Sequence, residues 1–313
     1  MDDIKVSIVA ITHNQENYIK RALTSLVNQD FKLPYEIIVV NDSSKDLTGN
    51  IIADFVKKYA NIKVVNVNCH AAGLARIEGI KISRGKYITF LDCDDYYDHK
   101  MVSTLYEVIE KEEADLVNCS NFYIKKNRIK KNPWVKDIVL NKIEALDALF
   151  SDTYFHGFMW AKIFKGEIIR NINFNLPKEN IIFEDILMSF EIILKCTKIV
   201  SISTPLYYYD KNNLESITNA TQCRAQSNVN IFAAIRYEID MLNDFDFLKI
   251  WRKHNTRRKF SIIADAYMDR RNNNIFKTVK ISFAQLKALN CKNKIDIKSY
   301  VFSNFIKKCF GMR

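Results

Sequence analysis

The first 125 residues alternate between short apolar segments and segments with helical periodicity, and this alternation limits the possible folds more than any other feature. Repeated strand–helix units predict an α/β fold with a mostly parallel sheet flanked by helices. The first four apolar runs are Ile4–Thr12, Tyr35–Val40, Ile62–Val67 and Tyr87–Leu91. Between and after them we expect helices over residues 16–28, 47–59, 71–83 and 100–112.

Polar residues directly follow three of these four strands. The carboxyl ends of parallel strands meet at one edge of a sheet, and ligands of such sheets bind beyond that edge. Three polar strand ends therefore predict a nucleotide-type pocket. They are Thr12-His13-Asn14, Asn41-Asp42-Ser43-Ser44 and Asp92-Cys93-Asp94-Asp95.

The acidic group after Leu91 needs a physical reason, because a buried carboxylate is costly unless it is paired, protonated or bound to a cation. Two carboxylates spaced by one residue, Asp92 and Asp94, can point into one cavity, and divalent cations such as Mg²⁺ take oxygen ligands. The alternative is a group of helix N-caps, a position that aspartate favours. Cys93 suits space-filling better than nucleophilic chemistry.

In this order, the polar stretches resemble the inverting glycosyltransferases of family 2, which have the GT-A fold, a Rossmann-like sheet flanked by helices. The likeness extends over about residues 4–218, and Arg84–Asp95 matches the family's DxD region closely. The sequence departs from the family at Ile11 and His13, where proline and tyrosine are usual, and at Asn41, where aspartate is usual. The other matching stretches are Asn41–Asp46, Ala75–Gly79, Trp160–Lys165, Phe183–Lys195 and Pro205–Thr218.

The resemblance implies a nucleotide-sugar donor, with a UDP-sugar expected, and Mn²⁺ or Mg²⁺ as the cofactor that neutralises the leaving diphosphate. It places Asp92 near the ribose and the metal, and Asp94 directly on the cation. Asx-turns and a surface ion pair are the alternatives for the strand-end residues and for Arg76. The expected nucleotide contacts are Thr12, His13, Asn14, Asn41, Asp42, Arg76, Asp92 and Cys93.

Inversion needs one base that removes the proton from the attacking hydroxyl. The resemblance gives this role to Asp185, with Glu184 as a supporting residue. Stabilisation of the helix N-terminus is the alternative for both. Trp160 and His156 are the candidates for acceptor binding, with a core position as the alternative for Trp160. The acceptor would be a glycan of capsule, lipopolysaccharide or teichoic acid, or a lipid- or protein-linked glycan.

Positive charge gathers at the C-terminal end. Residues 249–313 hold 17 lysines and arginines against three acids, whereas the whole chain has a net charge of +11. In the last predicted helix, 295–310, apolar residues face one side and lysines the other. This favours binding to an anionic membrane surface. Packing in a homodimer or against the catalytic part is the alternative, and no nucleic-acid partner is expected because no base-reading motif accompanies the charge.

The expected domains are a GT-A catalytic domain over 1–220 and a basic, mainly helical extension over 221–313. The first divides into a nucleotide-binding half, 1–125, and an acceptor-binding half, 126–220, which starts with a basic loop at Lys125–Lys136. Seven cysteines without zinc-like spacing indicate a reducing compartment. With no signal peptide or membrane span in the sequence, we expect a cytoplasmic protein, peripheral at the inner face of the membrane. A nucleotide-binding protein without turnover and a membrane-associated scaffold are the competing hypotheses.

Overall fold

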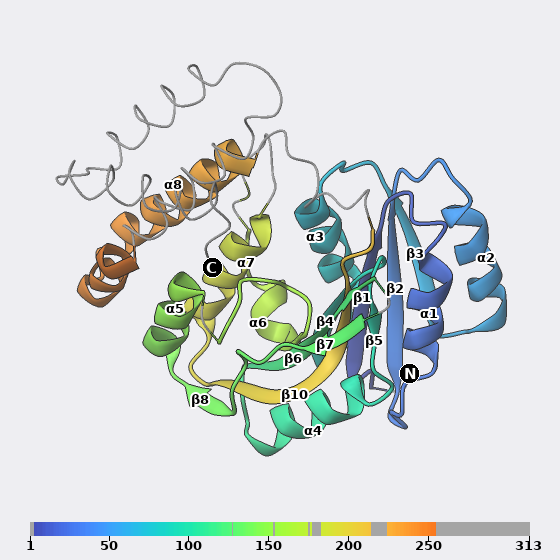
Figure 1. Ribbon diagram of the computed structural model, residues 1–313, viewed down its shortest axis with the longest axis horizontal. Coiled ribbons are helices and arrows are strands. Elements are labelled where there is room, and N and C mark those ends of the chain that lie inside the picture. The colour runs from blue at the N-terminus through green and yellow to red at the C-terminus, as the bar shows by residue number, and fades with distance from the viewer. Residues whose placement is uncertain are drawn as a thin grey trace. The chain divides into compact units, whose positions relative to one another are not determined.

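The computed structural model describes residues 3–126, 128–152, 154–174, 176, 183–213 and 224–254 (Figure 1). Within this part of the chain, ten strands form one mixed sheet in the order β3-β2-β1-β4-β9-β6-β10-β5, with β7 paired to β6 and β8 to β10. Helices flank the sheet, which confirms the predicted α/β class.

The N-terminal strands and helices follow the sequence prediction. All four strands pair in parallel. They are β1 (Val6–Thr12), β2 (Tyr35–Asp42), β3 (Ile62–Val67) and β4 (Tyr87–Asp92). The helices are α1 (Ile19–Val27), α2 (Thr48–Lys58), α3 (Ala72–Ile82) and α4 (Met101–Lys111).

The two faces of β1 contact different helices, because successive side chains of a strand point to opposite faces. Val6, Ile8 and Ala10 belong to a core cluster with Leu23 and other residues of α1. On the opposite face α3 approaches so closely that a Cβ on Gly79 would lie 2.3 Å from a methyl carbon of Val9. This close packing holds α3 against the sheet, and with it Arg76, one turn earlier.

Beyond residue 95 the sheet becomes mixed. The short strand β9 lies antiparallel between β4 and β6, so β6 runs in the same direction as β4. The segment expected as a basic loop instead forms β7, because it pairs antiparallel with the end of β6. The strands are β5 (Tyr96–Tyr97), β6 (Leu116–Lys125), β7 (Arg128–Lys131), β8 (Ile138–Leu140), β9 (Lys162–Lys165) and β10 (Ile199–Asp210). The helices are α5 (Lys142–Ser151), α6 (Gly166–Arg170) and α7 (Glu184–Lys195).

Internal contacts divide the chain into two units, Met1–Leu176 with Glu184–Ser216, and Pro177–Phe183 with Ile217–Arg313. The first contains the sheet. In the second, α8 (Arg224–Leu242) is helical as predicted, whereas the predicted helix 295–310 lies outside the described residues. The predicted domain boundary at residue 220 stays a prediction. Each helix in the described part is too short or too polar to cross a bilayer.

Candidate active site

Arg76 lies at the centre of the candidate site, where its guanidinium group binds three carboxylates. Its Nη1 donates to Glu184 at 2.9 Å and to Asp185 at 2.7 Å, and its Nη2 donates to Asp92 at 2.8 Å. Burial alone would lower the pKa of Arg76, but the charges of the three carboxylates outweigh it and raise that pKa. Residues predicted from three separate motifs therefore meet in one charge cluster, built from α3, β4 and α7.

Glu184 and Asp185 occupy the first turn of α7. The approach of α3 to this turn is close, since a Cβ on Gly73 would lie 2.5 Å from Cγ of Glu184. Burial raises the pKa of Asp185 to about 7 although Arg76 acts in the opposite direction, and burial also raises the pKa of Glu184. A carboxyl group that titrates near neutrality has the properties of a general base.

The acidic group after β4 divides into two kinds of carboxylate. Asp95 is buried and accepts hydrogen bonds from the Tyr207 hydroxyl and the Asp210 amide, both at 2.7 Å, so its contacts are structural. Asp94 accepts one from the Asn213 side chain at 3.1 Å, and its backbone carbonyl accepts one from Arg21 at 2.7 Å. Burial and the charge of Asp92 raise the pKa of Asp94 to about 6.

Asp92 and Asp94 fit a divalent cation by their chemistry. Both offer carboxylate oxygens, and the repulsion that raises the pKa of Asp94 would be relieved by a positive charge. In the described residues no group of three or more His, Cys, Asp or Glu side chains could hold a metal. Mg²⁺ commonly takes one or two protein carboxylates and completes its shell with substrate phosphates and water.

The polar side chains at the end of β2 form hydrogen bonds within the chain. The buried Asp42 accepts hydrogen bonds from the amides of Cys69 at 2.8 Å and Ala71 at 3.2 Å, and Asn41 donates to Asn66 at 3.0 Å. Asp42 therefore shapes the loop that leads from β3 into α3. A carboxylate has further lone pairs, so these two contacts leave room for a ligand donor.

At the end of β1, the candidates differ in exposure. Thr12 is buried, whereas His13 and Asn14 are exposed. His13 contacts the Asp42 carbonyl through Nδ1, and Asn14 is in the left-handed region with φ 51°, where its side chain accepts from the Lys45 amide. Cys93 is buried, and burial keeps the pKa of its thiol well above the usual value, so the thiol is neutral.

Comparisons with known proteins give the family of this chain. The family described as glycosyl transferase family 2 matches residues 7–167, about half of the chain. The chain belongs to this family. The uncharacterized glycosyltransferase EpsJ of Bacillus subtilis is 29% identical over 66% of this chain and 61% of its own length. The poly(ribitol-phosphate) beta-glucosyltransferase of Bacillus spizizenii is 32% identical over 69% of this chain but only 34% of its own length.

Solved structures show the same fold. Staphylococcus aureus TarS 1-349, in complex with UDP-GlcNAc, superimposes with a TM-score of 0.62 at 23% identity, over 73% of this chain and 65% of that one. The mannosyltransferase PcManGT of Pyrobaculum calidifontis, in complex with GDP-Man and Mn²⁺, gives 0.55 at 13% identity, over 100% and 91%. The fold and family predicted from the sequence are confirmed, whereas the individual site residues stay predictions.

In this family-2 chain, Trp160 is 6% exposed and stacks with the rings of Phe158, Tyr207 and Tyr209. Its ring centroid lies 4.4 Å from that of Phe158 and 4.7 Å from that of Tyr207. Phe158 is 38% exposed, so part of this residue is accessible to solvent. The predicted acceptor residue His156 bonds to Asp152 at 2.8 Å. Sequence reasoning missed Phe158, although its spacing of two from Trp160 was a usable signal.

Lys162 is a second residue that sequence reasoning missed. It lies in β9 and is 1% exposed, and its Nζ donates to the backbone carbonyls of His156, at 2.9 Å, and Phe158. Burial lowers the pKa of Lys162 to about 7, although the charge of Asp185 acts to raise it. Lys162 thus fixes the loop that carries His156 and Phe158, and its charge acts on Asp185.

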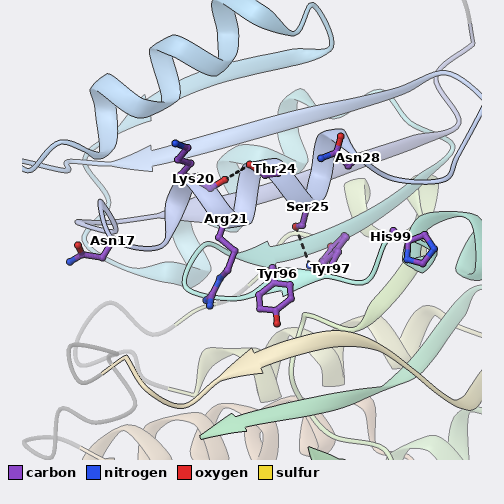
Figure 2. A pocket seen from close by; sticks show the side chains of 9 residues that line it. All are labelled: Asn17, Lys20, Arg21, Thr24, Ser25, Asn28, Tyr96, Tyr97 and His99. Atoms are coloured by element: carbon purple, nitrogen blue, oxygen red, sulfur yellow. Dashed lines mark hydrogen bonds between the residues drawn. The ribbon is translucent and has the colours of Figure 1, made fainter. Parts of the chain in front are cut away.

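A separate open pocket of about 540 Å³ lies beside α1 and contains none of the predicted site residues. Figure 2 shows its lining, which comes from α1 with its flanking residues and from the segment that follows β4. Arg21 joins this pocket to the site, because it donates to the Asp94 carbonyl and to Asp210 at 2.8 Å, while its guanidinium group lies 4.6 Å from the Tyr96 ring centroid. The lining residues are Asn17, Lys20, Arg21, Thr24, Ser25, Asn28, Tyr96, Tyr97 and His99.

Proposed function

We propose that this chain is a metal-dependent, inverting glycosyltransferase that moves a hexosyl or N-acetylhexosaminyl group from a nucleotide sugar to a hydroxyl group of a glycan. The observation that carries the proposal is the Arg76 cluster, which joins the predicted donor residue Asp92 to the predicted base Asp185. A UDP-sugar donor is supported by the ligand of TarS, and a teichoic-acid or related acceptor by the names of the relatives.

The charges at the site suit this reaction. Asp94 and Asp92 would hold Mn²⁺ or Mg²⁺, which when bound supplies Lewis-acid neutralisation of the leaving diphosphate. Asp185 accepts the proton of the acceptor hydroxyl, whose oxygen forms the new bond to the anomeric carbon. The bond from that carbon to the diphosphate oxygen breaks on the opposite face, and the nucleoside diphosphate leaves with the electron pair. Attack in line with the leaving group inverts the anomeric centre.

Arg76 has a further role in this reaction. Its positive charge keeps three carboxylates together in a buried place, where they would otherwise repel one another. Because Asp185 and Glu184 both bind Nη1, Arg76 orients the base, and Glu184 supports it.

The remaining predicted contacts form two groups around this centre. The donor would contact the ends of β1 and β2 and the start of the acidic group after β4. The acceptor would contact the loop held by Lys162, with His156 and Trp160 as the predicted residues and Phe158 as the exposed ring. The proposed donor contacts are Thr12, His13, Asn14, Asn41, Asp42, Arg76, Asp92 and Cys93.

The proposal is tested by metal-dependent release of UDP from a panel of UDP-sugars. We expect release with at least one sugar and Mn²⁺, and a loss of roughly 10²-fold or more in Asp94→Ala, because a metal ligand is missing. Asp54→Asn, on the exposed side of α2, is the matched control and should behave as wild type. A chain that binds UDP in a thermal-shift assay but releases none from any donor would instead be a nucleotide-binding protein without turnover.

Several finer predictions accompany this function. The proposed location is the cytoplasmic side of the membrane, and the proposed division is a catalytic domain to residue 220 followed by a basic extension. Membrane binding or dimer formation through residues 221–313 also stays a proposal. Deleting residues 255–313 and comparing vesicle binding and oligomeric state with the full chain tests both.

A further inference from the structure

A second concentration of positive charge lies in the sheet itself. Residues 125–126 and 128–136, here called the basic hairpin, comprise the end of β6, β7 and the segment that follows. They hold six lysines and arginines and no acid. All six cationic residues are exposed, and none forms an ion pair with another described residue. They are Lys125, Lys126, Arg128, Lys130, Lys131 and Lys136.

The basic hairpin also exposes two large apolar side chains, Trp134 at 66% and Ile129 at 57%. A single exposed apolar residue is ordinary on a protein surface. Exposed tryptophan and isoleucine close in sequence to six cations match the composition of peripheral membrane surfaces, in which apolar groups enter the headgroup region while lysines and arginines contact anionic lipids.

The presentation of Trp134 is fixed by a buried polar residue. Asn132 is fully buried; its side chain donates to Asn121 at 2.9 Å and accepts from the Trp134 amide at 3.1 Å. Its backbone carbonyl accepts from the Ser120 hydroxyl at 3.0 Å. Two of these hydrogen bonds tie the segment after β7 to β6, and the third holds the Trp134 backbone to the buried Asn132. The exposed indole is therefore carried by an ordered segment.

The basic hairpin begins at the edge of the sheet that carries the candidate active site. Because β6 runs in the same direction as β4, their carboxyl ends share this edge, and Figure 1 shows β7 beside β6. The Lys126 amide donates to Asn212 at 2.8 Å, and the next residue, Asn213, donates to Asp94. The residues Asn212 and Asn213 therefore link Lys126 of the basic hairpin to Asp94 of the acidic group.

We propose that the basic hairpin binds an anionic membrane surface, with Trp134 and Ile129 at the depth of the lipid headgroups. Charged side chains on an edge strand can also serve only to prevent sheet-to-sheet pairing. That simpler role does not account for an exposed Trp134 on a buried asparagine support. Membrane contact at this edge brings the candidate active site close to the lipid surface. The proposal stands independently of the transferase reaction.

Tryptophan fluorescence tests the inference directly, because the chain has three tryptophans and two of them, Trp160 and Trp251, are only 6% and 4% exposed. The full chain is mixed with vesicles of equal parts phosphatidylglycerol and phosphatidylcholine, or of phosphatidylcholine alone. We expect a blue shift and quenching by brominated lipid with the anionic vesicles only. Trp134→Phe should abolish both signals while co-sedimentation with the vesicles persists. Unshifted and unquenched emission with bound vesicles overturns the proposal.

Charge reversal separates the hairpin from the basic C-terminal residues. Lys130→Glu/Lys131→Glu should weaken binding to anionic vesicles by roughly tenfold or more, since each cation near an anionic surface contributes. Lys57→Glu/Lys58→Glu, at the exposed end of α2, makes the same change in net charge and should bind nearly as wild type. Equal binding by the hairpin variant and this control overturns the proposal.

A soluble polyanion is the competing ligand and is probed with inorganic polyphosphate in the absence of lipid. If the hairpin variant loses polyphosphate binding while wild-type Trp134 is not quenched in vesicles, the surface takes a polyanion and the membrane proposal fails. Thermal unfolding midpoints and UDP release of each variant should match wild type, because none of these residues belongs to the proposed catalytic site.

Discussion

Arg76 and Lys162 are both buried cations whose charges act on Asp185, but the fold satisfies them in opposite ways. Arg76, in α3, donates to three carboxylates. Lys162, in β9, donates to two backbone carbonyls and has no ion pair among the described residues. Accordingly the pKa of Arg76 is raised, whereas burial lowers that of Lys162 to about 7.

This difference shows that burial alone does not decide what a cation contributes. Arg76 stays charged at any ordinary pH, so it can hold carboxylates together and orient one of them. Lys162 can lose its proton near neutrality, so its charge is conditional while its hydrogen bonds position a loop. The first cation serves the proposed chemistry and the second the proposed acceptor side. Four variants test this division, in order of expected effect.

The largest effect should come from Asp185→Asn, which removes the carboxylate on which both cations act. We expect the rate of sugar transfer to fall by roughly 10²–10⁴-fold, the range for loss of a general base. UDP binding should stay near wild type, since Asp92 and Asp94 are unchanged. Steady-state kinetics with Glu107→Gln as control measure the change. A variant that keeps wild-type transfer would assign the base elsewhere.

Arg76→Met should reduce the free energy of unfolding by about 3–5 kcal/mol, because it leaves buried carboxylates without their cation. Urea unfolding measures this, with Lys81→Met as the control. Lys81 forms an exposed ion pair with Glu78 on the same helix, and its loss should cost less than about 1 kcal/mol. The loss at Arg76 should shrink when Asp185→Asn is also present. Strictly additive effects would contradict the charge cluster.

Lys162→Met should make stability less dependent on pH. The pKa of Lys162 is about 7 in the folded protein and that of lysine is about 10.4 when unfolded, so between these values the unfolded chain binds more protons. The free energy of unfolding of wild type should therefore rise from pH 7 to about pH 9, relative to the variant, by up to about 1.4 kcal/mol per pH unit.

Lys165→Met supplies the matched control on the same strand. A hydrogen bond to Glu167 raises the pKa of Lys165, so this residue stays protonated in both states over that pH range. Lys165→Met should change the free energy of unfolding by the same amount at pH 7 and at pH 9. Urea unfolding at the two pH values measures both variants. The same pH dependence in wild type and in both variants would show that the pKa of Lys162 is not lowered in the folded protein.

The smallest effect is expected for Phe158→Ala, which removes a partly exposed aromatic ring from the loop that Lys162 holds in place. Loss of one aromatic contact should raise the KM for the acceptor by roughly threefold to tenfold and leave kcat and the donor KM unchanged. Phe245→Ala, at a 73% exposed phenylalanine, is the control. A change in the donor KM instead would place Phe158 on the nucleotide side.

Local sequence was sufficient for the first four strands and their helices, because each carries its own hydrophobic period. It was insufficient for β9 and the far end of β10. β9 has only four residues, and its pairing with β4 and β6 depends on partners far away in the chain. β10 continues through Pro205 because its pairing with β6 shifts register there, and such irregularities tolerate a proline inside a strand.

In the candidate site, too, the sequence indicated some residues, whereas other features depend on the assembled fold. The resemblance to family 2 was enough to nominate Arg76, Glu184 and Asp185, and the position of Asp92 after a buried strand also pointed to it. Their meeting depends on the close approach of α3 at Gly73 and Gly79, which no local pattern records. Lys162 follows apolar residues in the sequence, a pattern that is also typical of a surface lysine. It is buried because β9 lies between β4 and β6, so only the assembled sheet reveals its burial.

Asp95 has a consequence for the order of assembly during synthesis. Its two hydrogen-bond partners, Tyr207 and Asp210, follow it by 112 and 115 residues. A chain emerging from the ribosome can therefore pair its first four strands long before this carboxylate finds a donor. Until β10 is synthesised, the turn that bears Asp94 lacks these two hydrogen bonds. A nascent or truncated polypeptide that ends before β10 would therefore have the first strands of the sheet without an ordered acidic turn at the proposed metal site.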